Sequence, residues 1–175
     1  DRVFSRSGTG TIATGTVFDG RVRIGDRLLV SPAGREVRVR GLQIRGLPEP
    51  EARAGDRCAL ALAGVSVDEV GRGDWIVDPA GHAPTQRLEV KVRLLPTSPA
   101  PLPRITELHL HVGTVAMPAR LVLSCADPLE PGASGLAHLI PSRPLLAAVA
   151  DRFILRDATA RRTVAGGIVL DPFAP

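Results

Sequence analysis

The sequence predicts an all-β protein built as two consecutive small β-barrels. Short segments of about four to ten residues alternate apolar with polar side chains, whereas the helical spacing of apolar residues is nearly absent. The 18 glycines and 16 prolines separate these segments as turn signals. Many short strands with frequent turns are typical of sandwiches and barrels. The length of 175 residues suffices for one large domain or for two small ones, each with its own core.

The clearest predicted strands are residues 36–40 and 87–94. In both, apolar residues occupy one face and Arg, Lys or Glu occupy the other. Earlier in the chain, Asp19-Gly20 predicts a hairpin between a strand at residues 11–17 and a short second strand. Gly25-Asp26 and Gly55-Asp56 repeat one local pattern, a Gly-Asp turn that leads into an apolar strand.

The chain is expected to divide near its middle. Residues 78–84 have no apolar period and contain two prolines and a glycine, which predicts a domain linker. A second proline-rich stretch, residues 96–103, is interpreted as a loop inside the second domain. The predicted domains are therefore residues 1–81 and 86–175.

Composition excludes several classes of function. The net charge is only +4, from 22 basic and 18 acidic residues, so a general nucleic-acid coat is not indicated. Lys91 is the single lysine, and arginine favours bidentate recognition of phosphate and other anions. No apolar run is long enough for a transmembrane helix, so we expect no membrane partner. Cys58 and Cys125 are interpreted as reduced core thiols of a cytosolic protein. The chain begins without Met, in sequence typical of a strand, and is expected to be part of a longer protein.

No catalytic motif is found. The sequence contains no Gly-x-x-x-x-Gly-Lys-Ser/Thr loop, no Cys-x-x-Cys or His-Glu-x-x-His motif and no Gly-x-Ser-x-Gly elbow. His109 and His111 are one metal-like pair, because on a strand they share a face about 7 Å apart. A third ligand is not evident, so a solvent-facing or ligand-facing strand is the favoured interpretation. We expect no catalysis, no cofactor and no metal in this chain.

A longer pattern covers nearly all of residues 1–80. It begins as Phe-x-x-x-Gly-x-Gly-Thr-x-x-Thr-Gly at residues 4–15 and resembles the second domain of translational GTPases such as elongation factor Tu. Residues 86–95, 104–124 and 133–175 resemble the third domain of the same proteins. The segments most similar to the selenocysteine-specific elongation factors are residues 1–5, 39–43, 109–111 and 151–157. The rest of the pattern is Val22-x-Ile24-Gly25-Asp26, Arg40-Gly41-Leu42-Gln43, Ala54-Gly55-Asp56-Arg57 and Arg72-Gly73-Asp74-Trp75.

This resemblance implies that the chain holds an aminoacyl-tRNA. In that family the second domain takes the terminal adenosine and the aminoacyl group, and the third domain takes the T-stem. Carried over by motif, the adenosine slot is Gly8, Thr9, Gly10 and Ile12, with Gln43 as the base-contacting residue. The implied selenocysteine pocket is Arg2 and Arg57 with the adjoining Asp1, and the implied T-stem loop is Ala160, Arg161 and Arg162.

The resemblance also implies partners outside this chain. These are selenocysteinyl-tRNA, the ribosome, a GTPase domain that holds GTP and Mg²⁺, and C-terminal domains that bind an mRNA hairpin. A cytoplasmic location follows from the same resemblance. Arg152 and Arg156 join the loop arginines as candidate contacts to tRNA phosphates. The alternative interpretation is a solvated face balanced by Asp151 and Asp157.

Charge gives a physical reason for two arginines in an aminoacyl pocket. A selenol is an anion at neutral pH, whereas the hydroxyl of serine, carried by the same tRNA before conversion, is neutral. Arginines aimed at the side chain would favour the anion and remain poorly satisfied beside serine. The alternative for Arg57 is an ordinary surface ion pair with a neighbour such as Asp56.

Two other functions remain as alternatives. One is a passive scaffold, a barrel pair from a translational GTPase resembling elongation factor Tu that links a GTPase domain to the ribosome. The other is a sugar-binding or protein-binding β-sandwich, which would need an exposed aromatic platform. Four Phe, one Trp and no Tyr argue against the latter, since Trp75 is expected in the core.

Overall fold

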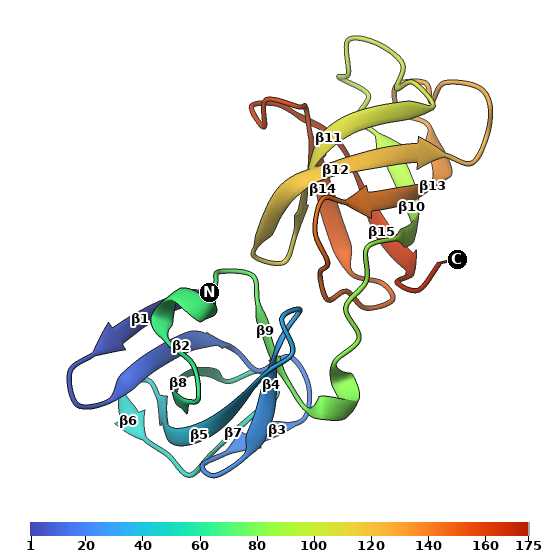
Figure 1. Cartoon of the computed structure of the whole chain (residues 1–175). Helices are drawn as coiled ribbons and strands as arrows, with labels where there is room; N and C mark the ends of the chain where they lie inside the picture. Colours follow the sequence, from blue (N-terminus) through green and yellow to red (C-terminus); the bar gives the residue numbers. More distant parts are fainter. Residues whose placement is uncertain (175) are drawn as a thin grey trace. The chain divides into compact units, whose positions relative to one another are not determined.

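The chain folds into two compact units, Asp1–Ala83 and Pro84–Pro175 (Figure 1). The computed structural model describes residues 1–174, and the predicted all-β class with two successive barrel domains is confirmed. The units separate beside the 3-10 helix η2 (Pro79–Gly81), which begins where the Asp78 carboxylate accepts the Ala80 N–H at 2.9 Å. Neither 3-10 helix in this part of the chain has the length and apolar character needed to cross a membrane.

The first unit is built on a seven-stranded antiparallel sheet in the order β1-β2-β8-β5-β4-β9, with β6 paired to β5 and a separate β3–β7 pair. Its buried core holds apolar side chains such as Val30, Val39 and Leu62. The 3-10 helix η1 precedes β9. The bounds are β1 (Arg2–Arg6), β2 (Gly10–Thr16), β3 (Arg21–Arg23), β4 (Arg27–Ser31), β5 (Arg35–Ile44), β6 (Leu47–Pro48), β7 (Glu51–Arg53), β8 (Arg57–Ala63), η1 (Val67–Glu69) and β9 (Trp75–Val77).

The predicted Gly-Asp turns form, and each leads into a strand of the first unit. In each turn a glycine with φ between 95° and 99° precedes an aspartate whose carboxylate accepts a backbone N–H three residues earlier, at 2.7–2.8 Å. Only glycine adopts this left-handed backbone without strain. The pattern occurs a third time, at Gly73-Asp74 before β9, in addition to the two predicted copies before β4 and β8.

The predicted Asp19-Gly20 hairpin is wrong. The turn is present, with Gly20 at φ 67°, but β3 pairs with β7 and not with β2. The end of β2 instead contacts the turn before β8, because Val17 donates to the Asp56 carbonyl at 2.9 Å. The turn follows from local residue chemistry, whereas the partner of β3 is about 30 residues further along the chain and is set by long-range packing.

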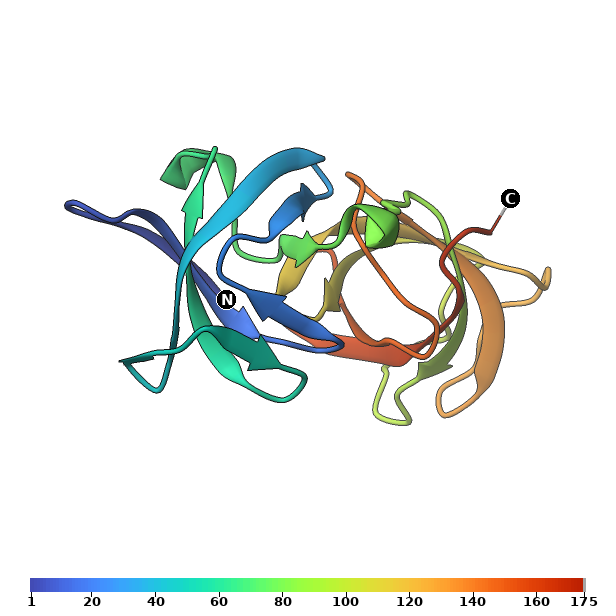
Figure 2. The same ribbon diagram turned by 90° about the horizontal axis from the view of Figure 1, so that it is seen from below.

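The second unit is a closed six-stranded antiparallel barrel in the order β10-β13-β12-β11-β14-β15. Figure 2 shows its strands around the ring, whose interior is filled by Leu and Val side chains such as Leu110, Leu121 and Val169. Residues 96–103 form the expected loop, with one bridge from Leu102 to Leu129. The bounds are β10 (Leu88–Leu94), β11 (Ile105–Val112), β12 (Val115–Leu123), β13 (Ser134–Pro141), β14 (Arg152–Arg156) and β15 (Thr163–Asp171).

Two residues that were expected in the core, Cys125 and Trp75, are more exposed than predicted. Cys58 is buried, but Cys125 is exposed in the turn after β12, where its Sγ lies 3.4 Å from the Asp127 carbonyl oxygen. Trp75 is only partly buried, because it packs on edge strand β9 against Phe18, at 5.1 Å between ring centroids. Apolar neighbours in sequence did not distinguish an interior strand from an edge or a turn.

Candidate functional site

Most of the predicted site lies on the face of the first sheet that points away from its core, called here the outer face. The strand register places Arg2 opposite Thr14, Thr14 opposite Ala59 and Ala59 opposite Gln43. Directly paired residues on antiparallel strands share a face. This row therefore spans four strands, and Arg2 and Gln43 lie about 14 Å apart at its two ends by strand spacing.

The neighbouring row gives the outer face a floor of small and apolar residues. Phe4 pairs with Ile12, Ile12 with Ala61 and Ala61 with Gly41. Ile12 is only 8% exposed although it alternates with Ala13, which faces the core. Phe4 is 44% exposed at the edge of this floor. Polar and charged residues border an apolar surface here, which suits a ligand with a flat ring and a charged end.

Arg57 begins β8 on the same outer face, since it lies two residues before Ala59. Its Nη1 donates to the Asp1 carboxylate in an ion pair whose side chains are 63% exposed for Arg57 and 32% exposed for Asp1. Asp1 is itself fixed to the sheet, because its nitrogen donates to the Thr14 carbonyl at 2.8 Å. The Asp56 carboxylate, the partner considered from sequence, accepts the Arg53 N–H instead.

The outer face therefore carries two arginines near one carboxylate. Strand spacing and residue rise put the Cα atoms of Arg2 and Arg57 about 12 Å apart, with β2 between them. Within residues 1–174 Arg2 forms no ion pair. The pair with Asp1 uses one N–H of the five that a guanidinium offers, and so leaves Arg57 able to bind a second anion.

A further exposed arginine of the first unit, Arg72, belongs to the Arg-Gly-Asp-Trp motif of residues 72–75. Arg72 is exposed in a turn closed by the Gly71 N–H and the Asp74 carboxylate at 2.7 Å.

Cys58, next to Arg57, belongs to the interior and not to this cluster. Burial raises the pKa of the Cys58 thiol, Asp56 raises it further, and only Arg57 acts in the opposite direction. The thiol therefore stays neutral and packs as a small apolar group.

The glycine-rich segment lies at the opposite end of the β1–β2 ladder. Thr9 donates to the Arg6 carbonyl at 3.0 Å, and Gly8 and Gly10 have φ values of 77° and 86°. No atom lies within 4 Å of the Cβ position of either glycine, so both expose their backbone at a hairpin tip. Asp1, Arg2 and Arg57 thus lie at one end of the β1–β2 ladder, and Gln43 lies at the level of Arg2 but on β5. Ile12 lies in the next row, and Gly8–Gly10 lie at the far end of the ladder.

The predicted T-stem loop connects β14 to β15 and is held by one carboxylate. Asp157 Oδ1 accepts the Arg161 N–H at 2.9 Å and the Thr159 hydroxyl at 2.8 Å, and these contacts, in that order, hold the Asp157 pKa below its usual value. Ala160 adopts φ 55°, and its carbonyl accepts Arg156 Nη1 at 3.0 Å. Arg161 and Arg162 are exposed on this fixed loop.

The two acids that the alternative interpretation would pair with these arginines bind backbone groups instead. Asp151 accepts the Ala148 N–H at 2.9 Å, and Asp157 holds its own loop. In residues 1–174 neither acid forms an ion pair with Arg152, Arg156 or the loop arginines. The arginines of this edge therefore keep free donors.

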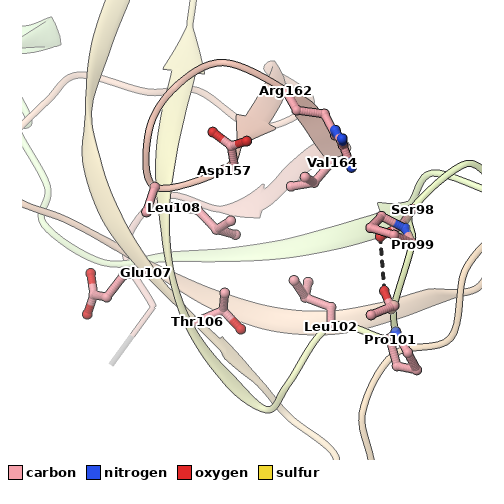
Figure 3. Close-up of a pocket in the computed structure, with 12 residues that line it drawn as sticks. Ser98, Pro99, Pro101, Leu102, Thr106, Glu107, Leu108, Asp157, Arg162 and Val164 are labelled. Carbon is pink, nitrogen blue, oxygen red and sulfur yellow. Dashed lines mark hydrogen bonds between the residues drawn. The ribbon is translucent and has the colours of Figure 1, made fainter.

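A hollow of about 290 Å³ lies beside the same loop (Figure 3). Leu102, Leu108 and Val164 line it on the apolar side, and Arg162 lies at its edge. The 96–103 loop forms another wall, in which the Ser98 hydroxyl donates to the Ala100 carbonyl at 2.9 Å. This hollow offers an apolar surface next to one arginine.

The two histidines of β11 do not form a metal centre in the described chain. Their ring centroids are 6.4 Å apart, and residues 1–174 contain no group of three His, Cys, Asp or Glu that could hold an ion. Burial, Arg156 and His109 all lower the pKa of His111. A neutral imidazole beside an arginine fits a partly buried strand better than a cation site.

Residues 86–175 match the family model described as the β-barrel domain of the selenocysteine-specific elongation factor, and residues 10–77 match domain 2 of elongation factor Tu. The chain belongs to the selenocysteine-specific elongation factor family.

Its relatives are longer proteins. The selenocysteine-specific elongation factor of Desulfomicrobium baculatum is 38% identical over 172 residues, which are 98% of this chain and 27% of the relative. The Escherichia coli protein of the same name is 34% identical, over 98% of this chain and 26% of its own length. The chain thus spans about a quarter of these relatives. The apo elongation factor SelB of Methanococcus maripaludis shares the fold, with a TM-score of 0.82, 24% identity, and coverage of 99% of this chain and 42% of that one.

Proposed function

We propose that the two barrels hold selenocysteinyl-tRNA, with the first barrel at the aminoacyl end and the second on the T-stem. The single observation that carries this proposal is the pair of exposed arginines on one sheet face, Arg57 oriented by Asp1 and Arg2 without an ion pair within residues 1–174. The relatives are named for selenocysteine, whose side chain is an anion at neutral pH.

The arginine pair supplies a physical basis for choosing selenocysteine over serine. A charge-assisted hydrogen bond from guanidinium to selenolate contributes about 1.5–3 kcal/mol, whereas a neutral hydroxyl gains much less. Size cannot make the distinction, because selenocysteine, cysteine and serine differ by too little for a pocket to sort them. Charge therefore carries the selectivity.

The rest of the outer face would take the terminal adenosine. Ile12 and the small residues beside it offer an apolar floor for a base, and Gln43 offers an amide at its border. Gly8, Thr9 and Gly10 extend this surface with exposed backbone groups at the hairpin tip.

The second barrel would contact phosphates through its fixed loop. Ala160, Arg161 and Arg162 are presented by Asp157, so their arrangement exists before the tRNA binds. Contacts of this kind position the RNA backbone and do not read its sequence.

In this proposal the chain itself is not catalytic. GTP and Mg²⁺ would bind a GTPase domain elsewhere in the full-length protein, and that domain, the ribosome and C-terminal mRNA-hairpin-binding domains would be its partners in the cytoplasm. The barrels would release the aminoacyl end when the GTPase domain moves. A second candidate is a barrel pair acting as a scaffold, as favoured by the match of the first barrel to domain 2 of elongation factor Tu.

The test compares selenocysteinyl and seryl esters of one tRNA, bound to the full-length protein with GTP. We expect a preference for selenocysteine that falls by about 10- to 100-fold in Arg57→Ala, the equivalent of one charge-assisted hydrogen bond. Arg53→Ala is the matched control, since Arg53 is also an exposed arginine paired with an acid, Glu51. Equal affinity of the wild-type protein for both esters would refute the proposal and leave the scaffold.

A further inference from the structure

A second group of arginines lies on the outer face, and none of the roles proposed above uses it. Arg27 on β4 and Arg38 on β5 are directly opposite each other in the antiparallel ladder. Arg38 in turn pairs with Ala63 on β8, and Arg6 pairs with Gly10 on β2. Continued by one residue past the Thr11–Leu62 pair, the same register sets Gly10 opposite Ala63. The resulting line, Arg6–Gly10–Ala63–Arg38–Arg27, is called here the arginine row.

The arginine row is not neutralised within the described chain. Arg6, Arg27 and Arg38 are exposed, and none of them takes part in an ion pair of residues 1–174. The acid nearest in register is Glu36, two residues before Arg38 and opposite Leu29, and it also forms no ion pair in this part of the structure. Three cations therefore face solvent beside one unpaired carboxylate.

The pairing of Arg27 with Arg38 is unfavourable for folding. Like charges directly opposite on antiparallel strands are destabilising, and a glutamate at either position would stabilise the sheet. The remaining positions of the row, Gly10 and Ala63, are small and do not cover the space between the arginines. The repulsion between these arginines costs the fold stability, and a bound polyanion would relieve it.

The arginine row continues the proposed binding surface. Gly10 is a member of the row and closes the hairpin tip, and Ile12 lies in the adjacent row of the same face. By strand spacing, the Cα atoms of Arg6 and Arg38 lie about 14 Å apart, and those of Arg38 and Arg27 about 5 Å apart. Arg27 and Arg38 are therefore close enough to bind one phosphate together. A single-stranded RNA whose terminal base lies on the apolar floor would therefore pass over the arginine row with its preceding nucleotides.

We propose that the arginine row binds the phosphodiester backbone of the single-stranded 3′ end, just before its terminal adenosine. This inference rests on the proposed function, because the adenosine slot fixes where the strand begins. The row carries charge and no base-reading group, so it contributes affinity and salt dependence without sequence or amino-acid selectivity.

The decisive variant is Arg27→Glu, because its effects on folding and on binding have opposite signs. In the 175-residue chain, the new Glu–Arg pair is expected to raise the melting temperature of the first unit by roughly 2–5 °C. Affinity for a fluorescent single-stranded RNA ending in CCA is expected to fall about tenfold, and its salt slope to shrink by about 0.7 per lost phosphate contact. Arg38→Gln serves as a second variant should Arg27→Glu misfold. Arg21→Glu, on the separate β3–β7 pair, is the charge-matched control.

Competitors identify the ligand. A blunt RNA duplex with the same number of phosphates and inorganic polyphosphate should each compete at least tenfold less well than the CCA-ending strand. Equal competition by the duplex would overturn the assignment to the single-stranded end. Unchanged RNA affinity and salt slope in folded Arg27→Glu and Arg38→Gln would overturn the site itself.

The outcome is separable from the proposed function. In the full-length protein, row variants should weaken selenocysteinyl-tRNA and seryl-tRNA by the same factor and leave their ratio unchanged. If the wild-type protein prefers selenocysteine and the row variants bind tRNA as tightly as it does, the proposed function stands and the arginine row is rejected as a binding site. If the row variants bind RNA more weakly but the wild-type protein does not distinguish the two esters, the arginine row stands and the proposed function is rejected.

Discussion

Removal of the Asp157 carboxylate should weaken tRNA binding although it makes the second barrel more positive. In Asp157→Ala the Arg161 N–H loses its acceptor at 2.9 Å and the Thr159 hydroxyl loses its partner at 2.8 Å. Both contacts lie within the loop that presents Arg161 and Arg162. Without them the loop gains conformations, and the ordering entropy must then be supplied on binding.

The size of the effect follows from the number of arginines that the loop presents. If Arg161 and Arg162 each contact one phosphate, loss of both reduces the salt slope of tRNA binding by about 2 and the affinity by about tenfold or more at low salt. The assay is a salt titration of aminoacyl-tRNA binding to the full-length protein.

Glu130→Ala provides the matched control for this experiment. It removes one negative charge from an exposed turn of the same barrel, and its side chain makes no hydrogen bond within residues 1–174. Long-range electrostatics alone predicts slightly tighter binding for both variants. If Asp157→Ala binds tRNA as tightly as Glu130→Ala, with an unchanged slope, the proposed role of the fixed loop is wrong.

Two further predictions concern the stability of the second barrel. Gly167→Ala should lower its free energy of unfolding by about 3–5 kcal/mol in urea denaturation, since the new Cβ would overlap the Lys91 carbonyl oxygen of the paired strand. In Gly15→Ala the new Cβ would make only an ordinary contact at 4.0 Å, so the free energy of unfolding of the first unit should change by less than about 1 kcal/mol. Equal losses in the two variants would show that close packing around Gly167 is not the cause. The pKa of His111 is lowered by burial first and then by neighbouring positive charge, so protonation favours the unfolded chain. Melting temperature should therefore fall as pH drops below about 6.5, with a flatter profile in His111→Gln; identical profiles would show that other groups cause the loss.

Much of the fold could be predicted because alternation and turn chemistry are local. The predicted strand at 36–40 lies within β5, and the one at 87–94 corresponds to β10 except for its first residue; in both, every second residue is buried. The partner of a strand is not a local property, which explains the error at β3. The sheet order that brings β8 beside both β2 and β5 depends on long-range packing of the whole core.

The candidate site could be predicted only in part, because it too depends on which strands pair. A family motif located Arg57, but its ion-pair partner, Asp1, is 56 residues away in sequence. The arginines of the row are plain in the sequence, yet only the register shows that Arg27 and Arg38 face each other. The pairing of β5 with β8 on its other side includes a register shift between Val39 and Gly41, which spacing alone does not reveal.

In the proposed pocket, the contact between Asp1 and Arg57 is expected to orient the guanidinium and to limit its affinity for a second anion. A guanidinium that already holds a carboxylate at one N–H is oriented and partly satisfied, so a neutral serine hydroxyl gains little from joining it. A selenolate can use the remaining donors or displace the carboxylate, and it has Arg2 on the other side of β2. Exposed ion pairs contribute only about 0–1 kcal/mol, so the displacement is readily reversible. Asp1→Asn removes a negative charge that competes with the selenolate and not with the neutral hydroxyl, so it should raise the affinity for the selenocysteinyl ester more than for the seryl ester. An unchanged or lowered ratio between the two esters would refute this role for Asp1.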